Sequence, residues 1–368
     1  MAVAFSADGR SLLSLGRDNT ALRWAADPLG VLGRPLGSGG DGYSSVAFSP
    51  DSKILAATSA DHGVTLWDPE RAQPIRAPLQ GQSNVILSIA FTADGGKLLS
   101  AAKDRKVEWA VSSGTPKAAT LPGTDEPVSE VAFSPDGNST AWSDGSVLLV
   151  RRGTVAPPIR LPIGLASDSH MIMSLVFSPD GRSIASGGFD GTLALWEVSS
   201  RKLLWPAAKA HRMAVKTLAF SPDGKILASA GVGTADFDDS VRLWDTQSGQ
   251  ELPPALTGHS LPVRALVFSP DGKMLACGAG EQIVFWDIER RQRLGESIAY
   301  NGGFVTALAF SPDARWLGSG GYDDNAILWD LRPDVWQRQA CAIANRNLDE
   351  REWKQLIGDN PPYRKSCP

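Results

Sequence analysis

A short motif of the form Ala/Val-Phe-Ser/Thr-Pro/Ala-Asp recurs eight times along the chain of 368 residues. Successive copies lie 42 to 48 residues apart, and a nearly fixed period of this length is typical of repeat architectures. Any fold must therefore accommodate eight similar units in register. The phenylalanines of the motif are Phe5, Phe48, Phe91, Phe133, Phe177, Phe220, Phe268 and Phe310.

A second anchor follows in each unit, because a tryptophan ends a later apolar run in seven of the eight, with Val150 in its place in the fourth. Short strands separated by turns connect the anchors, such as 226–229 and 241–244. Asp occupies the first turn of every unit, with Pro before it in six units and Gly after it in six, which favours tight antiparallel hairpins. The tryptophans are Trp24, Trp67, Trp109, Trp196, Trp244, Trp286 and Trp329.

The stretch after each tryptophan contains Pro and Leu, as at 249–256, and can supply a fourth strand. A four-stranded sheet with apolar residues on both faces cannot bury them alone, whereas sheets arranged radially cover one another and protect their edges. We therefore expect an all-β propeller over residues 1–331, followed by a helical tail over 332–368.

The chain resembles the WD-repeat family, because a Trp-Asp dipeptide ends four units at Trp67, Trp244, Trp286 and Trp329. The resemblance covers about 330 residues and implies a WD-repeat β-propeller that binds proteins without catalysis. In that family a His, a Ser or Thr, an Asp and the Trp form a buried hydrogen-bonded set. The sixth unit has all four, whereas the seventh has Cys277 in the serine position, so we expect the sixth blade to be stiffer. The complete set is His211, Ser229, Asp238 and Trp244.

Eight units predict a ring of eight blades, with seven blades and one separate unit as the alternative. The chain starts on a first strand with no outer strand before it, and no obvious outer strand follows Asp330. We therefore expect one blade to have three strands. We also expect Met1 to be a truncated start or to lie within a longer repeat array.

The tail carries helix signals at Pro333-Asp334 and at Asp349-Glu350. Its sequence from Trp336 to Cys367 resembles the segment that closes the WD-repeat arrays of large bacterial signalling proteins, which carry an upstream nucleotide-binding or kinase module. This chain has neither a GxxxxGK[ST] loop nor a kinase signature set. The resemblance implies an alternative function as the regulatory C-terminal half of such an NTPase or kinase, with an upstream effector domain of the same polypeptide as partner.

Loops on one face of the ring are the candidate partner-binding site, since this face commonly binds partners in the WD-repeat family. They are the second-turn loops and the loops before the first strands. Aromatic and basic side chains on these loops are typical of interaction hot spots, although exposed aromatic residues are also common and scattered over protein surfaces. A lengthened loop at 231–239 and the methionines of 165–173 are further candidates, Met171 and Met173 fitting contact and packing equally well. The candidate contacts are Arg17, Lys103, Phe189, Phe237, Tyr322, Met213 and Leu261.

Charge and cysteine content argue against several classes of protein. The net charge is −4 with Lys and Arg scattered, which disfavours nucleic acid, and no apolar run reaches the length of a membrane span. Cys277, Cys341 and Cys367 are too few for a disulfide scaffold and lack metal-ligand spacing, which favours the cytoplasm. We expect protein partners and no metal or cofactor.

Catalysis is not expected, because the abundant acidic residues occupy turn positions that the fold explains, and no nucleophile elbow or metal-binding helix is present. The alternative is an enzyme or a small-molecule binder that uses the central channel. That function would need His, Glu and Arg converging on the innermost strands. The first strands at 2–5 and 217–220 instead consist of packing residues.

Overall fold

The computed structural model describes residues 2–5, 11–15, 21–25, 33–38, 45–58, 61–82, 84–102, 105–120, 128, 130–144, 147–152, 159–161, 171–232, 240–259, 261–294, 297–299, 303–321 and 325–332. All regular elements in these residues are β-strands. No helix able to span a membrane is found in this part of the chain. The expected helices of the tail, from 333 onward, lie outside the described residues.

The chain divides into two compact units, which are described separately. One unit comprises Met1–Arg34 with Trp329–Pro368, and the other Pro35–Leu328. The first contains an antiparallel sheet of β1 (Ala2–Phe5), β2 (Ser11–Leu15) and β3 (Ala21–Ala25).

The two anchors of a unit lie opposite the same residue of its middle strand. In the sheet β1–β3, Leu12 pairs with Phe5 on one side and with Trp24 on the other. The same register recurs in later units, where the central residue is also aliphatic: Phe48–Leu55–Trp67, Phe91–Leu98–Trp109, Phe177–Ile184–Trp196, Phe220–Leu227–Trp244 and Phe268–Leu275–Trp286.

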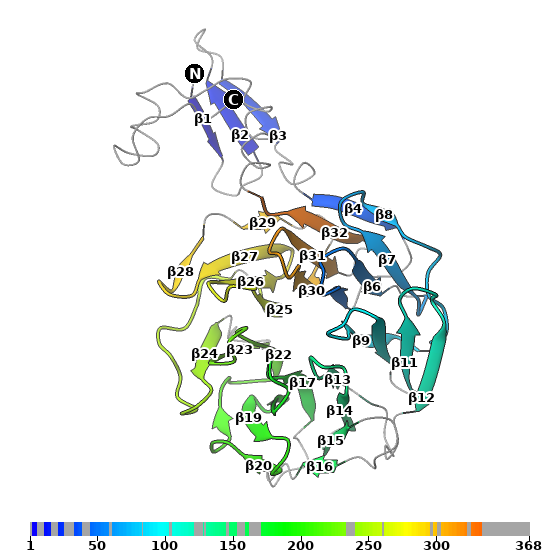
Figure 1. Ribbon diagram of the computed structural model, residues 1–368. Helices are drawn as coiled ribbons and strands as arrows, with labels where there is room; N and C mark the ends of the chain where they lie inside the picture. Colours follow the sequence, from blue (N-terminus) through cyan, green and yellow to red (C-terminus); the bar gives the residue numbers. More distant parts are fainter. Residues whose placement is uncertain are drawn as a thin grey trace. The chain divides into compact units, whose positions relative to one another are not determined.

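Seven further sheets, here called blades 1 to 7, follow along the chain (Figure 1). Blade 1 contains β5 (Val46–Phe48), β6 (Leu55–Thr58), β7 (Val64–Asp68) and β8 (Gln73–Pro74). Blade 2 contains β9 (Ile86–Phe91), β10 (Lys97–Ala102), β11 (Arg105–Ala110) and β12 (Pro116–Thr120). Blade 3 contains β13 (Glu130–Phe133), β14 (Ser139–Asp144), β15 (Val147–Arg152) and β16 (Ile159–Leu161).

Blade 4 contains β17 (Ile172–Phe177), β18 (Ser183–Gly188), β19 (Thr192–Glu197), β20 (Lys202–Leu203) and β21 (Ala208–Lys209). Blade 5, built from the sixth unit, contains β22 (Val215–Phe220), β23 (Ile226–Gly231) and β24 (Val241–Asp245), and Glu251 and Leu256 bridge to β24. Blade 6 contains β25 (Val263–Phe268), β26 (Met274–Ala279), β27 (Gln282–Asp287), β28 (Gln292–Arg293) and β29 (Ile298–Ala299).

Blade 7 is completed by a strand from far earlier in the chain. Its order is β30 (Val305–Phe310), β31 (Trp316–Gly321), β32 (Asn325–Asp330) and then β4 (Gly33–Ser38). The expectation that no outer strand closes the last blade is therefore wrong. Residues 33–38 were missed because they have neither the apolar alternation nor the anchors of the repeat.

The inner strands form a closed cycle. Each contacts the next in the order β5, β9, β13, β17, β22, β25 and β30, and β30 contacts β5 again (Figure 1). Seven blades complete this cycle, so an eighth is not needed to close it. The preferred expectation of eight blades and the alternative of seven blades and a separate unit both stay predictions.

The core lies between neighbouring blades rather than within one sheet. One buried cluster joins Leu243 of blade 5 to Leu266 and Trp286 of blade 6. Another joins Leu55 and Trp67 of blade 1 to Trp316 and Leu328 of blade 7, and Leu36 of β4 belongs to it. Because each blade buries apolar surface against both neighbours, the ring is stabilised as a whole.

The first turns repeat one hydrogen-bonded arrangement in all seven blades. A Ser or Thr hydroxyl donates to the Asp carboxylate two residues later at 2.5–2.7 Å. The carboxylate also accepts a backbone N–H two residues further on, at 3.0–3.1 Å. The pKa of Asp223 is lowered first by the Ser221 hydroxyl and then by the amide of Lys225. The pairs are Ser49–Asp51, Thr92–Asp94, Ser134–Asp136, Ser178–Asp180, Ser221–Asp223, Ser269–Asp271 and Ser311–Asp313.

The contribution of β4 to stability can be tested at Leu36, which is almost fully buried. We expect Leu36→Ala to lower the free energy of unfolding by about 2–5 kcal/mol, because it leaves a cavity at the junction of blades 7 and 1. Leu294→Ala, at an exposed position after β28, is the control and should change it by about 0.5 kcal/mol or less. Urea unfolding measures both. Equal losses would mean that β4 does not stabilise the ring.

Candidate partner-binding surface

A buried hydrogen-bonded set in blade 5 fixes the loop that leads into β22. His211 Nε2 and Ser229 Oγ are 2.9 Å apart, and Trp244 Nε1 donates to the same oxygen at 2.9 Å. All three side chains are buried. The structure thus brings together three of the four residues predicted for this set, and Asp238 lies outside the described residues.

Related sets differ from blade to blade. In blade 2, Ser100 Oγ accepts from Trp109 Nε1 and from Gln82 Nε2, both at 2.9 Å. Gln82 stands where blade 5 has His211, and it was missed because only histidine was sought at that position. In blade 6, Trp286 Nε1 donates to His259 Nε2 at 3.2 Å, with Cys277 buried in the serine place.

The loop held by His211 in turn packs against the second turn of blade 4. The amides of Ala210 and His211 both donate to the carbonyl of Gly191, at 2.9 and 3.1 Å. Gly191 has φ +83°, and a Cβ there would collide with the carbonyl oxygens of His211 and Met213. Only glycine allows this close approach, so the two loops are fixed to each other.

These two loops and the residue before β17 carry an exposed apolar surface, here called the start-face patch because it lies at the end of the ring where inner strands begin. It consists of Met171, Phe189 and Met213, which expose 44%, 45% and 40% of their surface. The amide of Phe189 donates to the carbonyl of Met171 at 2.7 Å, and Gly191 joins both to the loop of Met213. The patch is thus apolar and fixed by backbone contacts.

The other predicted contacts have different positions. Leu261 is half-buried, because its side chain packs over Gly280. Met173 is also half-buried on β17. Four predicted contacts and most of the lengthened loop, 233–239, lie outside the described residues. The four are Arg17, Lys103, Phe237 and Tyr322.

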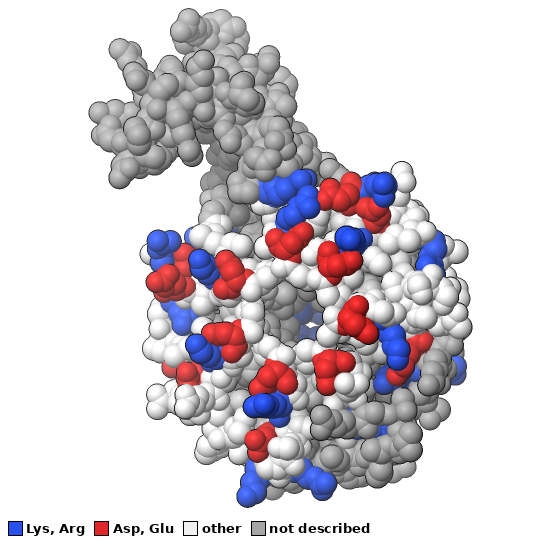
Figure 2. Space-filling view, in the orientation of Figure 1, with Lys and Arg blue, Asp and Glu red and all other residues white. Residues whose placement is uncertain are grey.

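Charge does not distinguish one region of the face that Figure 2 shows. Figure 2 shows a hollow at the centre, with acidic and basic side chains interspersed around it. Many surface carboxylates have a cation nearby, as in the pairs Arg71–Asp68 at 2.7 Å and Arg290–Asp287 at 3.0 Å. Exposed apolar side chains therefore identify a docking region better than charge does.

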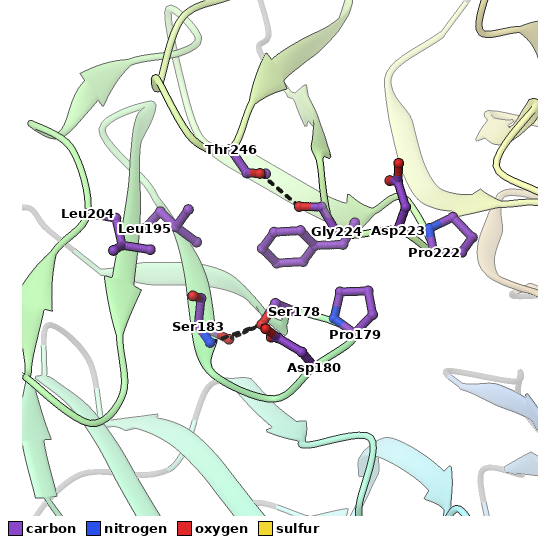
Figure 3. A pocket seen from close by; sticks show the side chains of 11 residues that line it. Ser178, Pro179, Asp180, Ser183, Leu195, Leu204, Pro222, Asp223, Gly224 and Thr246 are labelled. Atoms are coloured by element: carbon purple, nitrogen blue, oxygen red, sulfur yellow. Dashed lines mark hydrogen bonds between the residues drawn. The ribbon is translucent and has the colours of Figure 1, made fainter.

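A cavity of about 450 Å³ lies between blades 4 and 5, at the first turns (Figure 3). Pro179 and Pro222 line it, together with the side chains of Leu204 and Phe220. Its polar groups bond within the protein, since Thr246 Oγ1 donates to the carbonyl of Gly224 at 2.7 Å and Ser178 Oγ accepts the amide of Ser183 at 2.9 Å. The packing of neighbouring turns accounts for this cavity.

The central channel carries three charged residues that sequence reasoning missed. They are Glu130 on β13, Lys216 on β22 and Arg264 on β25, and all other described residues of the seven inner strands are uncharged. The prediction of packing residues concerned 2–5 and 217–220, at the ends of the strands before the phenylalanine, and these residues carry no charge. It did not extend to the beginnings of the inner strands, where the three charges lie.

Comparison with known proteins agrees with this architecture, in which radial antiparallel sheets define a β-propeller. The family model "WD domain, G-beta repeat" matches residues 33–68, 165–197, 206–245, 251–287 and 294–330. The chain thus contains WD repeats, which supports a WD-repeat family, whose members are generally non-catalytic scaffolds for protein–protein interaction. The first matched segment begins with β4, so one repeat supplies the outer strand of blade 7 and the inner strands of blade 1.

A distant relative agrees with this family. WD repeat-containing protein VIP3 of Arabidopsis thaliana is 30% identical over 115 residues. The match covers 27% of this chain and 36% of the plant protein, so it spans about a third of that relative.

The hydrogen-bonded set of blade 5 predicts unequal costs for two serines. Ser229→Ala leaves Trp244 Nε1 without its acceptor and removes a partner of His211, so we expect a loss of about 2–4 kcal/mol. Ser186→Ala removes only the acceptor of Trp196 Nε1, at 3.2 Å, and should cost about 1–2 kcal/mol. Urea unfolding distinguishes them, and a Ser186 variant as unstable as the Ser229 variant would contradict the account.

The channel carboxyl predicts a pH dependence of stability. Burial raises the pKa of Glu130 from 4.5 to about 7, and the ammonium of Lys216 partly opposes the rise. The folded state thus holds this proton more tightly, so the resulting stabilisation is complete below pH 4.5 and is lost as pH rises through 7. The free energy of unfolding of Glu130→Gln, relative to that of the wild type, should therefore increase as the pH rises from 5 to 8. Chemical unfolding at both pH values tests this, and a constant difference would contradict it.

Proposed function

We propose that this chain is a non-catalytic scaffold or sensor module that binds a partner protein on its start face, with the start-face patch as the docking site. The observation that carries the proposal is the exposure of three large apolar side chains, two on loops that are fixed to each other and one just before β17. Such side chains on rigid loops resemble interaction hot spots, because little conformational entropy is lost on binding.

The buried hydrogen-bonded sets within the blades also support the start face as the docking face. His211 and Gly191 hold the loops that bear Met213 and Phe189, so the hydrogen bonds within the blades stabilise the surface offered to a partner. Loops placed on a rigid scaffold commonly carry binding function. We further propose that the ring functions as a closed propeller of seven blades, since the inner strands contact one another in a complete cycle.

The alternative function, as the regulatory half of a larger bacterial signalling NTPase or kinase, is compatible with this proposal, because an upstream effector domain would be one such partner. It rests on the sequence of the tail, which lies outside the described residues from 333 onward.

The test is affinity capture from a lysate of the source organism with three matched chains: wild type, Phe189→Asp and Ile75→Asp. Phe189 and Ile75 are almost equally exposed, but Ile75 follows the outer strand β8 rather than a start-face loop. We expect a carboxylate at 189 to weaken partner binding by at least about tenfold, since it adds charge to an apolar contact. Ile75→Asp should bind like the wild type.

Thermal unfolding first establishes that all three chains are equally folded. Proteins retained by the wild type and Ile75→Asp but lost by Phe189→Asp support the proposed face. Retention by all three would show that the partner binds elsewhere, and loss from both variants would assign binding to the outer strands as well.

A further inference from the structure

Five inner strands share an irregularity near their beginnings. In each, pairing with the second strand skips one residue, as Val215 pairs with Gly231 and Thr217 with Ala230, leaving Lys216 between them. Such bulges redirect a side chain and are over-represented beside functional sites. The skipped residues lie at the same register position in their blades: Leu87, Met173, Lys216, Arg264 and Thr306.

The skipped position faces the channel. Lys216 Nζ lies 3.9 Å from Glu130 Oε1, although β22 and β13 are separated in the ring by β17. The two side chains can meet only by crossing the inner surface of β17, within the channel. Lys216 and Glu130 expose similar fractions of their side chains, 31% and 29%, so the pair is partly accessible to solvent.

Arg264 lies next to this pair on the neighbouring strand. β25 contacts β22, and Arg264 occupies the register position of Lys216. Its guanidinium carbon is 5.2 Å from the centre of the Phe304 ring, which orients the side chain from one side. Its Nε is buried and has no hydrogen-bond partner among the described residues. The Nε atoms of Arg76 and Arg242 are also buried without such a partner, so this N–H points to a ligand only together with the position of Arg264 beside Lys216.

We infer that the start end of the central channel is a binding site for a compact oxyanion, a small carboxylate or phosphate, held by Lys216 and Arg264. The planar guanidinium suits two oxygens of such an anion, and the ammonium adds a point charge beside it. Glu130 competes with the anion for Lys216, because its carboxylate already forms an ion pair with the Lys216 ammonium. One carboxylate and two cations leave the described inner strands with a net positive charge, which selects against cationic ligands.

This site goes beyond the proposed docking of a protein and does not depend on it. The start-face patch binds through apolar side chains on the loops, whereas the oxyanion site uses charges inside the channel. Met213 lies three residues before Lys216, so a bound anion would lie close to the loop that carries part of the patch.

Isothermal titration calorimetry of the full chain at pH 8, above the raised pKa of Glu130, tests the inference, with inorganic phosphate and succinate as separate probes in a chloride buffer. We expect Arg264→Gln to weaken binding by at least about tenfold, since a charge-assisted hydrogen bond is lost. Glu130→Gln should tighten it by about fivefold, because Lys216 is released to the anion. Lys216→Gln should weaken it and also remove most of the gain from Glu130→Gln in the double variant.

Arg242→Gln is the matched control. Arg242 is partly exposed like the channel cations, but it lies on β24 and pairs with Glu251 at 3.1 Å. It should leave binding within about twofold of the wild type. Thermal unfolding establishes that each variant is folded, and Arg264→Lys, which keeps the charge, replaces Arg264→Gln if that variant is unfolded and should bind with intermediate strength.

The outcomes separate clearly. Binding of either probe with the expected order of variants supports the site and shows which anion it prefers. No binding of phosphate or succinate to the wild type or to Glu130→Gln would overturn the inference. Equal weakening by Arg264→Gln and Arg242→Gln would also overturn it, because it would mean non-specific attraction to positive charge.

Discussion

Closure of the ring is the constraint on which the rest of the structure depends. Each blade has apolar residues on both faces, so an open row of blades would leave two faces exposed to water. Contact between β30 and β5 removes those ends, and β4 adds the outer strand that completes blade 7. Buried Leu36 and Trp316 show that this junction is packed like the others. Chain segments almost 300 residues apart in sequence therefore stabilise one another.

Much of the fold could be predicted because the repeat depends on contacts between residues that are close in sequence. Phe and Trp pack on either side of one aliphatic residue, and Ser and Asp bond within a single turn, so each rule is contained in one unit. Closure was not predictable in the same way. Residues 33–38 have no repeat signature, and their role as an outer strand depends on β32, which lies far away in sequence.

The candidate site residues also differ in whether a sequence pattern could predict them. His211, Ser229 and Trp244 could be predicted together from a family pattern, whereas Gln82 in blade 2 could not, because it replaces the expected residue type. The exposure of Met171 was left open, since alternation alone does not assign the exposed face. Lys216 was missed because the prediction considered only the ends of the inner strands before the phenylalanine, whereas Lys216 lies at the beginning of β22.

A propeller of this kind offers a rigid ring on which loops and channel can vary independently. The account is tested most directly by replacing Phe189, Met213 or Ile75 in turn with a photo-reactive phenylalanine and irradiating the chain in a lysate of the source organism. Positions 189 and 213 lie in the start-face patch, and position 75 is a similarly exposed control. The account predicts that the same protein is cross-linked from 189 and 213 and not from 75. Cross-linking of that protein from 75 alone, or of unrelated proteins from 189 and 213, would contradict it.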